Sequence, residues 1–304
     1  MSSLYREQAH NVRRTFFFMG LFLIVVIAIS WLISVIFASP AILYIAVILS
    51  VGLNVVAYWK SDTIVIRITR AKPVTRDTHF DYWNSVENLC ISIGVPMPKL
   101  YVIDDPAPNA FATGRDPKHA AVAVTSGLLH VMEKQELEGV LAHEIAHIQN
   151  RDTLIMTVIV VLFGMVTILL DLALHASLFS SDEEGGNMLI LLPIYIVAPI
   201  ILMIIRFAVS RKREFLADAT AGVYTRYPEG LASALRKIER ASRPVQGART
   251  ATAHLFIADP FASHARGRTI PPTEKRLGFM RLFDTHPPIP ERVQALVGNT
   301  GNNG

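Results

Sequence analysis

Three residues with the chemistry of a metal site stand close together in the stretch 139–150. They are His143, Glu144 and His147, in the spacing His-Glu-x-x-His. On a helix, side chains four residues apart lie on one face, so both imidazoles can reach the same metal ion. Glu144, one position further round, can reach a water molecule next to that ion. Zinc peptidases combine two histidine ligands with a general base in this way, and the motif therefore predicts such an enzyme.

The surrounding sequence favours a helix for this motif. Residues 133–150 carry apolar side chains at intervals of three and four, a spacing typical of a helix packed against a core. These side chains are Leu137, Val140, Leu141, Ile145 and Ile148. A catalytic zinc site also needs a third protein ligand and a place for the substrate, which must come from elsewhere in the chain.

The best candidate for the third ligand is Glu214. It begins a helix expected after the apolar run 188–205, while the histidine helix leads into the apolar run 153–170. If these two runs pair as an antiparallel hairpin, Glu214 returns to the neighbourhood of the histidines. Asp218, one turn further on, is placed to orient a ligand imidazole or to pair with a cation. The alternative for Asp218 is an ordinary surface carboxylate.

His286 is a candidate for a further contact in the reaction. It lies in the proline-rich turn 285–288. We predict that it donates a hydrogen bond to the oxyanion that forms during peptide hydrolysis. The alternative is a histidine with a structural part in the turn.

Composition indicates a membrane protein. Apolar residues make up 51% of the chain and charged residues only 18%, a balance that an ordinary soluble domain does not show. Four uncharged apolar runs, at 16–37, 41–59, 153–170 and 188–205, each approach the length of about 20 residues that a bilayer-spanning helix needs. We expect two transmembrane hairpins. The alternative for the second pair is a hairpin that lies on the membrane rather than across it.

Basic residues gather at the ends of these runs. They are Arg13, Arg14, Lys60, Arg67, Arg70, Lys72, Arg206, Arg211, Lys212 and Arg213. The acidic link 171–187 falls on the opposite side, so the positive-inside rule places the non-membrane part in the cytoplasm. This distribution predicts contact with a lipid bilayer and excludes a nucleic-acid partner. The single cysteine, Cys90, rules out an intramolecular disulfide and a thiolate zinc site.

The remaining segments predict a small α+β domain. Strands are expected at 100–103, 109–114 and 120–125, and a short strand is possible within 63–69. Helices are expected at 77–93, 126–132, 133–150, 214–226, 228–241 and 290–297, with a long loop at 242–272. The domain organisation that follows is an N-terminal transmembrane hairpin (1–60), the first part of the protease domain (61–152), a second hairpin (153–209) and the second part of the protease domain (210–304).

Several separated motifs resemble one known family. His143-Glu-Ile-Ala-His147 followed by Glu214-Phe-Leu-Ala-Asp218 resembles the gluzincin pattern of HtpX-type membrane proteases, relatives of the CAAX prenyl endopeptidases. The stretches 108–114, 121–129, 254–261 and 285–288, together with Arg292, are also similar and occur in the family's order. The resemblance implies a mainly α integral membrane protein with four transmembrane helices and a cytoplasmic, zincin-like α+β protease domain. Its small sheet would have an exposed edge.

The resemblance also implies an activity and a place. A zinc-dependent endopeptidase of the bacterial inner membrane is expected, one that removes misfolded or damaged membrane proteins, often under stress. By position, the resemblance implies that His143, His147 and Glu214 bind one Zn²⁺ per chain. It also implies that Glu144 is the general base. Because the histidine helix runs almost directly into a membrane span, hydrolysis should occur near the cytoplasmic surface of the bilayer. Substrates in or at the membrane would be favoured.

Two further roles rest on the resemblance. The family's edge strand would correspond to Asn109, Ala110, Phe111, Ala112 and Thr113, which would pair with the substrate backbone by β-augmentation. Asn109 could instead be a turn residue. Arg292 would either pair with the acids of the site or carry a solvated charge. The region 242–284 does not align closely with the family, which leaves substrate selection open.

Two other functions compete with this prediction. A membrane scaffold could keep a zinc site without catalysis, although it would most simply have lost Glu144. A CAAX-type processing enzyme would cleave a narrow, prenylated substrate, but that family carries more spans than this chain provides. The sequence indicates neither the physiological substrates and the cleavage preference nor the oligomeric state and the induction signal.

Overall fold

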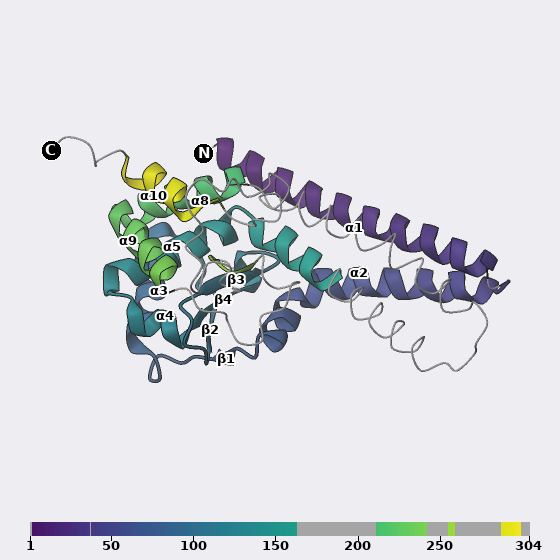
Figure 1. Ribbon diagram of the computed structural model, residues 1–304, viewed down its shortest axis with the longest axis horizontal. Coiled ribbons are helices and arrows are strands. Elements are labelled where there is room, and N and C mark those ends of the chain that lie inside the picture. The colour runs from purple at the N-terminus through teal and green to yellow at the C-terminus, as the bar shows by residue number, and fades with distance from the viewer. Residues whose placement is uncertain (1, 37, 163–210, 242–254, 259–286, 299–304) are drawn as a thin grey trace, which may run out of the picture.

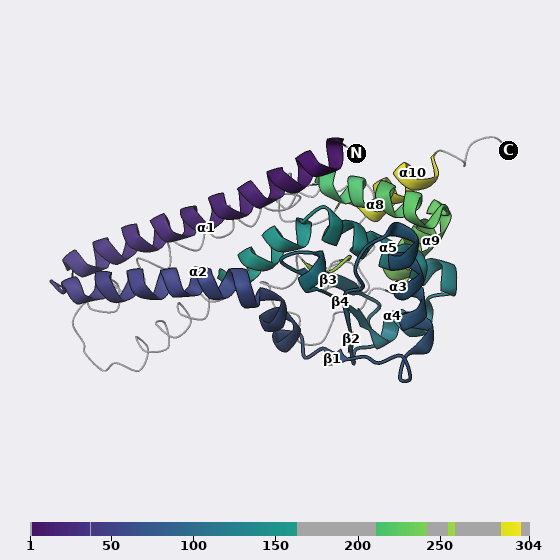
Figure 2. The same ribbon diagram turned by 180° about the vertical axis from the view of Figure 1, so that it is seen from behind.

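A hairpin of two long helices and a larger α+β part make up the structure, a computed structural model that describes residues 2–36, 38–162, 211–241, 255–258 and 287–298. Helices α1 (Ser2–Ile36) and α2 (Pro40–Ile68) run side by side and project away from the sheet (Figures 1 and 2). The segments Gln8–Ala28 and Pro40–Ile68 are long and apolar enough to cross a membrane. Large apolar side chains on their surface are exposed, among them Ile24, Trp31, Tyr44, Ile48, Leu49 and Val55. The first predicted hairpin is therefore confirmed as two long apolar helices.

The second predicted hairpin is described only at its beginning. The helix Asp152–Leu162 follows the histidine helix after a bend of 80°. The rest of the third predicted span and all of the fourth, residues 163–210, lie outside the described residues. A total of four spans therefore stays a prediction.

The possible strand within 63–69 is wrong, because α2 continues as a helix to Ile68. Alternating isoleucines suggested a strand, but burial follows the helical period. Ser61 and Val65, four residues apart, are both buried, while Arg67 is exposed. Packing of this end of α2 against the α+β part explains the helix, because Val65 and Ile66 join a buried cluster beneath the sheet.

The sheet has four strands in the order β1-β2-β4-β3. Strand β2 (Lys99–Ile103) is parallel to β4 (Ala120–Thr125), and β3 (Ala110–Gly114) is antiparallel to β4 at the edge of the sheet. These are the three strands predicted from the sequence. The two-residue strand β1 (Lys72–Pro73), antiparallel to β2, was not predicted. Its proline stands on an edge, where a missing backbone N–H is tolerated.

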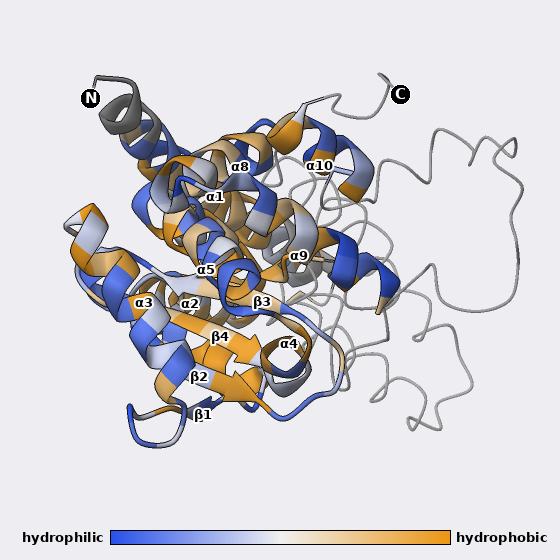
Figure 3. Cartoon of the chain, turned by 90° about the vertical axis from the view of Figure 1, so that its left-hand side faces the viewer, coloured by the Kyte–Doolittle hydropathy of each residue, from blue (hydrophilic) through white to orange (hydrophobic). Residues whose placement is uncertain are grey.

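The two faces of the sheet pack against different parts of the molecule. In β4, Val122 and Val124 face the layer of α3 (Phe80–Ile93), α4 (Ser126–Val131), α5 (Lys134–Gln149), α8 (Arg211–Thr225), α9 (Pro228–Arg240) and α10 (Ile289–Val297). Ala121 and Ala123 share the opposite cluster with side chains of α1, α2 and the helix Asp152–Leu162. This alternation follows the period of two of a strand. The sheet therefore lies between the histidine helix and the ends of α1 and α2, and its strands β2 and β4 are largely apolar (Figure 3).

The start of α5 is fixed by a capping box. The backbone N–H of Glu133 donates to the Glu136 side chain at 2.8 Å, an arrangement that satisfies helix-end donors. From α9, Ser233 and Lys237 also donate to Glu136, at 2.6 and 2.7 Å. Burial would raise the pKa of Glu136, but the hydrogen bonds from Lys237 and Ser233 lower it overall. The histidine helix is thus joined to α9 by a charged contact near its beginning.

Helices α5 and α9 cross at a pair of glycines. A Cβ on Gly139 would lie 2.6 Å from the backbone nitrogen of Leu231, and a Cβ on Gly230 would lie 2.6 Å from the carbonyl oxygen of Gln135. Both contacts involve backbone atoms, so neither can be relieved by moving a side chain. The close crossing places the histidine-bearing turns of α5 at a fixed distance from α9.

Replacing Gly139 with alanine is expected to lower the free energy of unfolding by about 1–3 kcal/mol, because the added methyl group overpacks the crossing. The midpoint of thermal unfolding of the purified protein in detergent measures this loss. Gly52→Ala is the control, since a Cβ there would meet no atom within 4 Å. Equal midpoints for the two variants would contradict the close crossing.

Candidate active site

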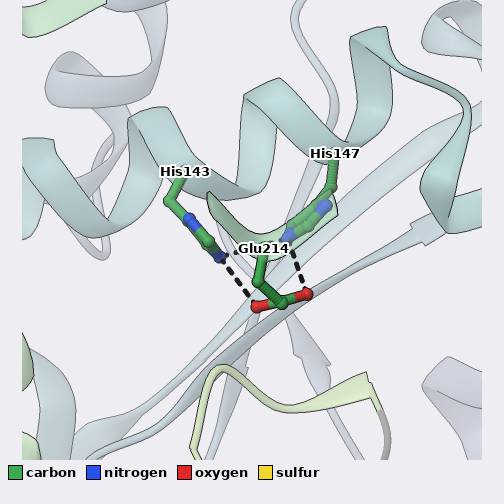
Figure 4. Close-up of side chains that lie close together, drawn as sticks. All are labelled: His143, His147 and Glu214. Atoms are coloured by element: carbon green, nitrogen blue, oxygen red, sulfur yellow. Dashed lines mark hydrogen bonds and ion pairs between the residues drawn. The ribbon is translucent and has the colours of Figure 1, made fainter. Parts of the chain in front are cut away.

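Three side chains that could hold a metal ion converge between α5 and α8 (Figure 4). They are His143, His147 and Glu214, whose ligand atoms all lie within 4.8 Å of one another. The Nε2 atoms of the two histidines are 3.1 Å apart. The Glu214 oxygens lie 3.9 Å from Nε2 of His143 and 3.6 Å from Nε2 of His147. The predicted trio is therefore brought together, with the histidines on successive turns of α5 and Glu214 in the first turn of α8.

The outer nitrogen of each histidine faces an aspartate. Nδ1 of His143 lies 3.0 Å from Oδ1 of Asp218, and Nδ1 of His147 lies 3.0 Å from Oδ2 of Asp152. A carboxylate at Nδ1 keeps a proton on that nitrogen and leaves the Nε2 lone pair pointing inward. Two inward lone pairs and a carboxylate repel one another unless a cation joins them. This donor set of two imidazoles and one carboxylate fits zinc.

The charges of the site favour a cation at its centre. Burial and the neighbouring His147 lower the pKa of His143 to about 4. Burial would also lower the pKa of His147, but Asp152 and Glu214 raise it to about 9. Without a metal ion, His147 therefore carries an extra proton at neutral pH, while His143 is neutral. A metal ion bound there would replace this proton, because histidine ligates metals in its neutral form.

Glu144 is buried beside the trio, with 2% of its surface exposed. Burial raises its pKa to about 7, the charge of His147 opposes this rise, and Glu214 adds to it. The backbone of Ala112, in the edge strand β3, lies near Glu144 and favours its charged form, which also opposes the rise of its pKa. A carboxylate with a pKa near neutrality can both accept and return a proton at physiological pH.

Asp218 is held by Arg292 of α10. Nε and Nη2 of Arg292 donate to the two carboxylate oxygens of Asp218 at 2.8 and 2.7 Å. Nη2 also lies 3.4 Å from Nε2 of His143, and Arg292 has no exposed surface. Burial would raise the pKa of Asp218, but Arg292 and His143 lower it to about 2. Two alternatives were considered for Arg292. It pairs with a buried acid, and the alternative of a solvent-exposed charge is wrong.

The predicted substrate strand is engaged by another segment of the chain. The carbonyl oxygen of Ala110 accepts the backbone N–H of Ile257 at 2.9 Å. The Asn109 side chain donates to the carbonyl oxygen of Ala258 at 3.0 Å and accepts from its N–H at 3.3 Å. Phe111 contacts Phe256 edge to face. This strand, including Ala112 and Thr113, is buried throughout, and its role in substrate binding stays a prediction.

Sequence reasoning missed one residue of the site, Asp152. It stands five positions after His147, beyond the end of α5, so helical periodicity does not place it near the histidine. Only the bend after Asn150 turns its carboxylate back toward His147. An acidic residue just beyond a metal-binding helix was the available signal. His286, predicted as an oxyanion donor, lies outside the described residues.

A family model and two curated relatives each match most of the chain. Residues 82–300 match peptidase family M48. The chain is 40% identical over 306 residues to a protease HtpX homolog of Caldanaerobacter subterraneus subsp. tengcongensis and 42% identical over 306 residues to one of Thermoanaerobacter pseudethanolicus, with 97% of both chains covered in each case. The crystal structure of S. mikatae Ste24p is similar with a TM-score of 0.49 at 20% identity, over 98% of this chain and 67% of that one.

The zinc content of purified variants distinguishes the metal ligands from the general base. We expect His143→Ala and Glu214→Ala to lose zinc, because each removes an atom of the converging trio. Glu144→Gln should keep zinc, since Glu144 does not belong to that trio. The measurement is elemental analysis of purified protein after dialysis against dilute zinc. Full zinc occupancy in Glu214→Ala would remove Glu214 from the metal site.

Arg292→Met is expected to lower the free energy of unfolding by about 3–5 kcal/mol, because it leaves the buried Asp218 carboxylate without its cation. The double variant Asp218→Asn/Arg292→Met should unfold at a higher temperature than Arg292→Met, since it removes the stranded charge. Thermal unfolding in detergent measures both. A double variant no more stable than Arg292→Met would argue against the ion pair.

Proposed function

The chain belongs to peptidase family M48, and from this premise we propose how its own residues hydrolyse peptide bonds. The HtpX protease relatives extend over almost the whole chain, and two helices are candidates to span a membrane. The protein is therefore a membrane-bound zinc metalloendopeptidase with a multi-pass architecture. The resemblance noted in the sequence is confirmed at this level, while the roles of individual residues stand as proposals.

His143, His147 and Glu214 are the proposed zinc ligands. The observation that carries this assignment is the inward approach of two Nε2 atoms, 3.1 Å apart, with the Glu214 oxygens 3.9 and 3.6 Å from them. Zinc bound there supplies a positive charge that makes a water molecule more acidic and polarises the scissile carbonyl. Asp152 holds the His147 imidazole in the tautomer that ligation needs, and Asp218 lies 3.0 Å from Nδ1 of His143, where it favours the same tautomer.

Glu144 is the proposed general base. It takes the proton of the attacking water and returns it to the amine that leaves. Its burial and its pKa of about 7 suit both steps. His286 remains the proposed oxyanion donor, on the basis of its place in the proline-rich turn 285–288.

The proposed substrates are misfolded or damaged membrane proteins, together with some soluble ones. The supporting observation is that the sheet packs on one face against α5, which carries Glu144, and on its other face against α1 and α2. A peptide at the site would therefore lie close to the bilayer. The basic ends of the apolar runs support a cytoplasmic orientation in a bacterial inner membrane, with hairpins at 1–60 and 153–209 and protease segments at 61–152 and 210–304.

Hydrolysis is tested with an unfolded soluble substrate, casein, and the full chain purified in detergent. Cleavage should require zinc, stop on addition of a chelator and return when zinc is restored. Glu144→Gln should lower the rate of cleavage at least about a hundredfold, because general acid–base catalysis contributes about 10²–10⁴ in rate. Glu138→Gln, the same change elsewhere on α5, should leave the rate unchanged.

Two outcomes would overturn the proposed mechanism. Zinc binding without cleavage of casein or of a membrane-protein substrate would favour a non-catalytic scaffold. Undiminished cleavage by Glu144→Gln would require another base.

Cleavage of unprenylated proteins at several sites would exclude a processing enzyme restricted to prenylated substrates.

A further inference from the structure

The membrane helix α1 makes a direct contact with the region behind the metal site. Nδ2 of Asn11 donates at 2.8 Å to the carbonyl oxygen of Asn150 and at 2.8 Å to Oδ1 of Asp152. Asn11 is 2% exposed and Asp152 is 3% exposed. A buried amide between two acceptors is a specific contact, because an unpaired polar group at this depth is costly.

Asp152 stands at a corner of the chain. Helix α5 ends at Gln149, Arg151 takes the left-handed conformation with φ 61°, and the next helix leaves at 80° to α5. The Asp152 carboxylate divides its oxygens between two directions. Oδ2 lies 3.0 Å from Nδ1 of His147, and Oδ1 receives Asn11 and lies 3.5 Å from Nε of Arg213.

We propose that Asn11 is a positioning residue for His147, acting through Asp152. This inference rests on the proposed role of His147 as a zinc ligand. By engaging Oδ1, the amide restrains rotation of the Asp152 carboxylate and keeps Oδ2 directed at Nδ1. It also holds the carbonyl of Asn150 and thereby the corner from which Asp152 projects. The first membrane helix therefore contributes to the geometry of the metal site without touching substrate or metal.

A second contact of α1 serves as an internal control. Nε2 of Gln8 donates at 2.7 Å to the carbonyl oxygen of Gln149. Gln8 thus joins the same helix to the same corner, one turn before Asn11, but it donates to a backbone carbonyl rather than to Asp152. Loss of Gln8 weakens the attachment of α1, whereas loss of Asn11 also removes a hydrogen-bond donor from Oδ1 of Asp152 and leaves Arg213 as its neighbour.

The experiment is a zinc-affinity measurement on the full chain in detergent, by competition with a chromophoric chelator of known affinity. Asn11→Leu should weaken zinc binding by about tenfold, the lower end of the range for partners beyond the ligands. Gln8→Leu should change it less than about twofold. Asn11→Asp, which replaces the donor with an acceptor at nearly constant volume, gives a second reading if Asn11→Leu folds poorly.

A double-variant cycle tests whether Asn11 acts through Asp152. Asp152→Asn should weaken zinc binding, and adding Asn11→Leu to it should produce little further loss. Fully additive losses, or equal affinities for Asn11→Leu and Gln8→Leu, would overturn the inference while leaving zinc ligation intact. Failure of the unsubstituted protein to bind zinc would instead contradict the proposed function itself.

Discussion

The approach of two imidazole nitrogens toward each other is the constraint on which the site depends. Nε2 of His143 and Nε2 of His147 lie 3.1 Å apart and face the carboxylate of Glu214. Such a group of donors is stable only around a cation, and three separate segments of chain are arranged to produce it. Helix α5 supplies the histidines, α8 supplies Glu214, and Asp152 and Asp218 hold the outer nitrogens. Arg292 then balances the charge of Asp218 from α10.

The sheet joins this site to the membrane hairpin. One face packs against α5 and its neighbours, and the other packs against α1, α2 and the helix Asp152–Leu162. Ala112 of strand β3 lies near Glu144. Ala110 of the same strand accepts a hydrogen bond from the backbone of Ile257. The proposal that peptides are hydrolysed next to a lipid surface rests on this layering. Any movement of α1 relative to the sheet would reach the site through the corner at Asp152.

Local periodicity was enough to predict much of this arrangement. The His-Glu-x-x-His spacing placed both histidines on one helical face, and short apolar stretches separated by turn residues located β2, β3 and β4. Glu214 could be predicted because a hairpin of the two expected apolar runs would return the chain to its starting side. The alternating isoleucines at 63–69 led to the wrong prediction of a strand, because packing of this segment against the sheet keeps α2 helical. Asp152 and Asn11 could not be predicted, since their contact depends on a bend after Asn150 and on how α1 packs, and neither leaves a periodic signal.

X-ray absorption at the zinc K-edge tests the central claim most directly, because it reports the atoms around the metal in the intact protein. The arrangement of His143, His147 and Glu214 predicts two imidazole nitrogens and carboxylate oxygen at about 2.0–2.2 Å, with no sulfur at about 2.3 Å. The multiple-scattering signal of imidazole should correspond to two histidines and fall by half in any preparation of His147→Ala that is loaded with zinc. A spectrum with one imidazole, or with sulfur, in the unsubstituted protein would contradict the account.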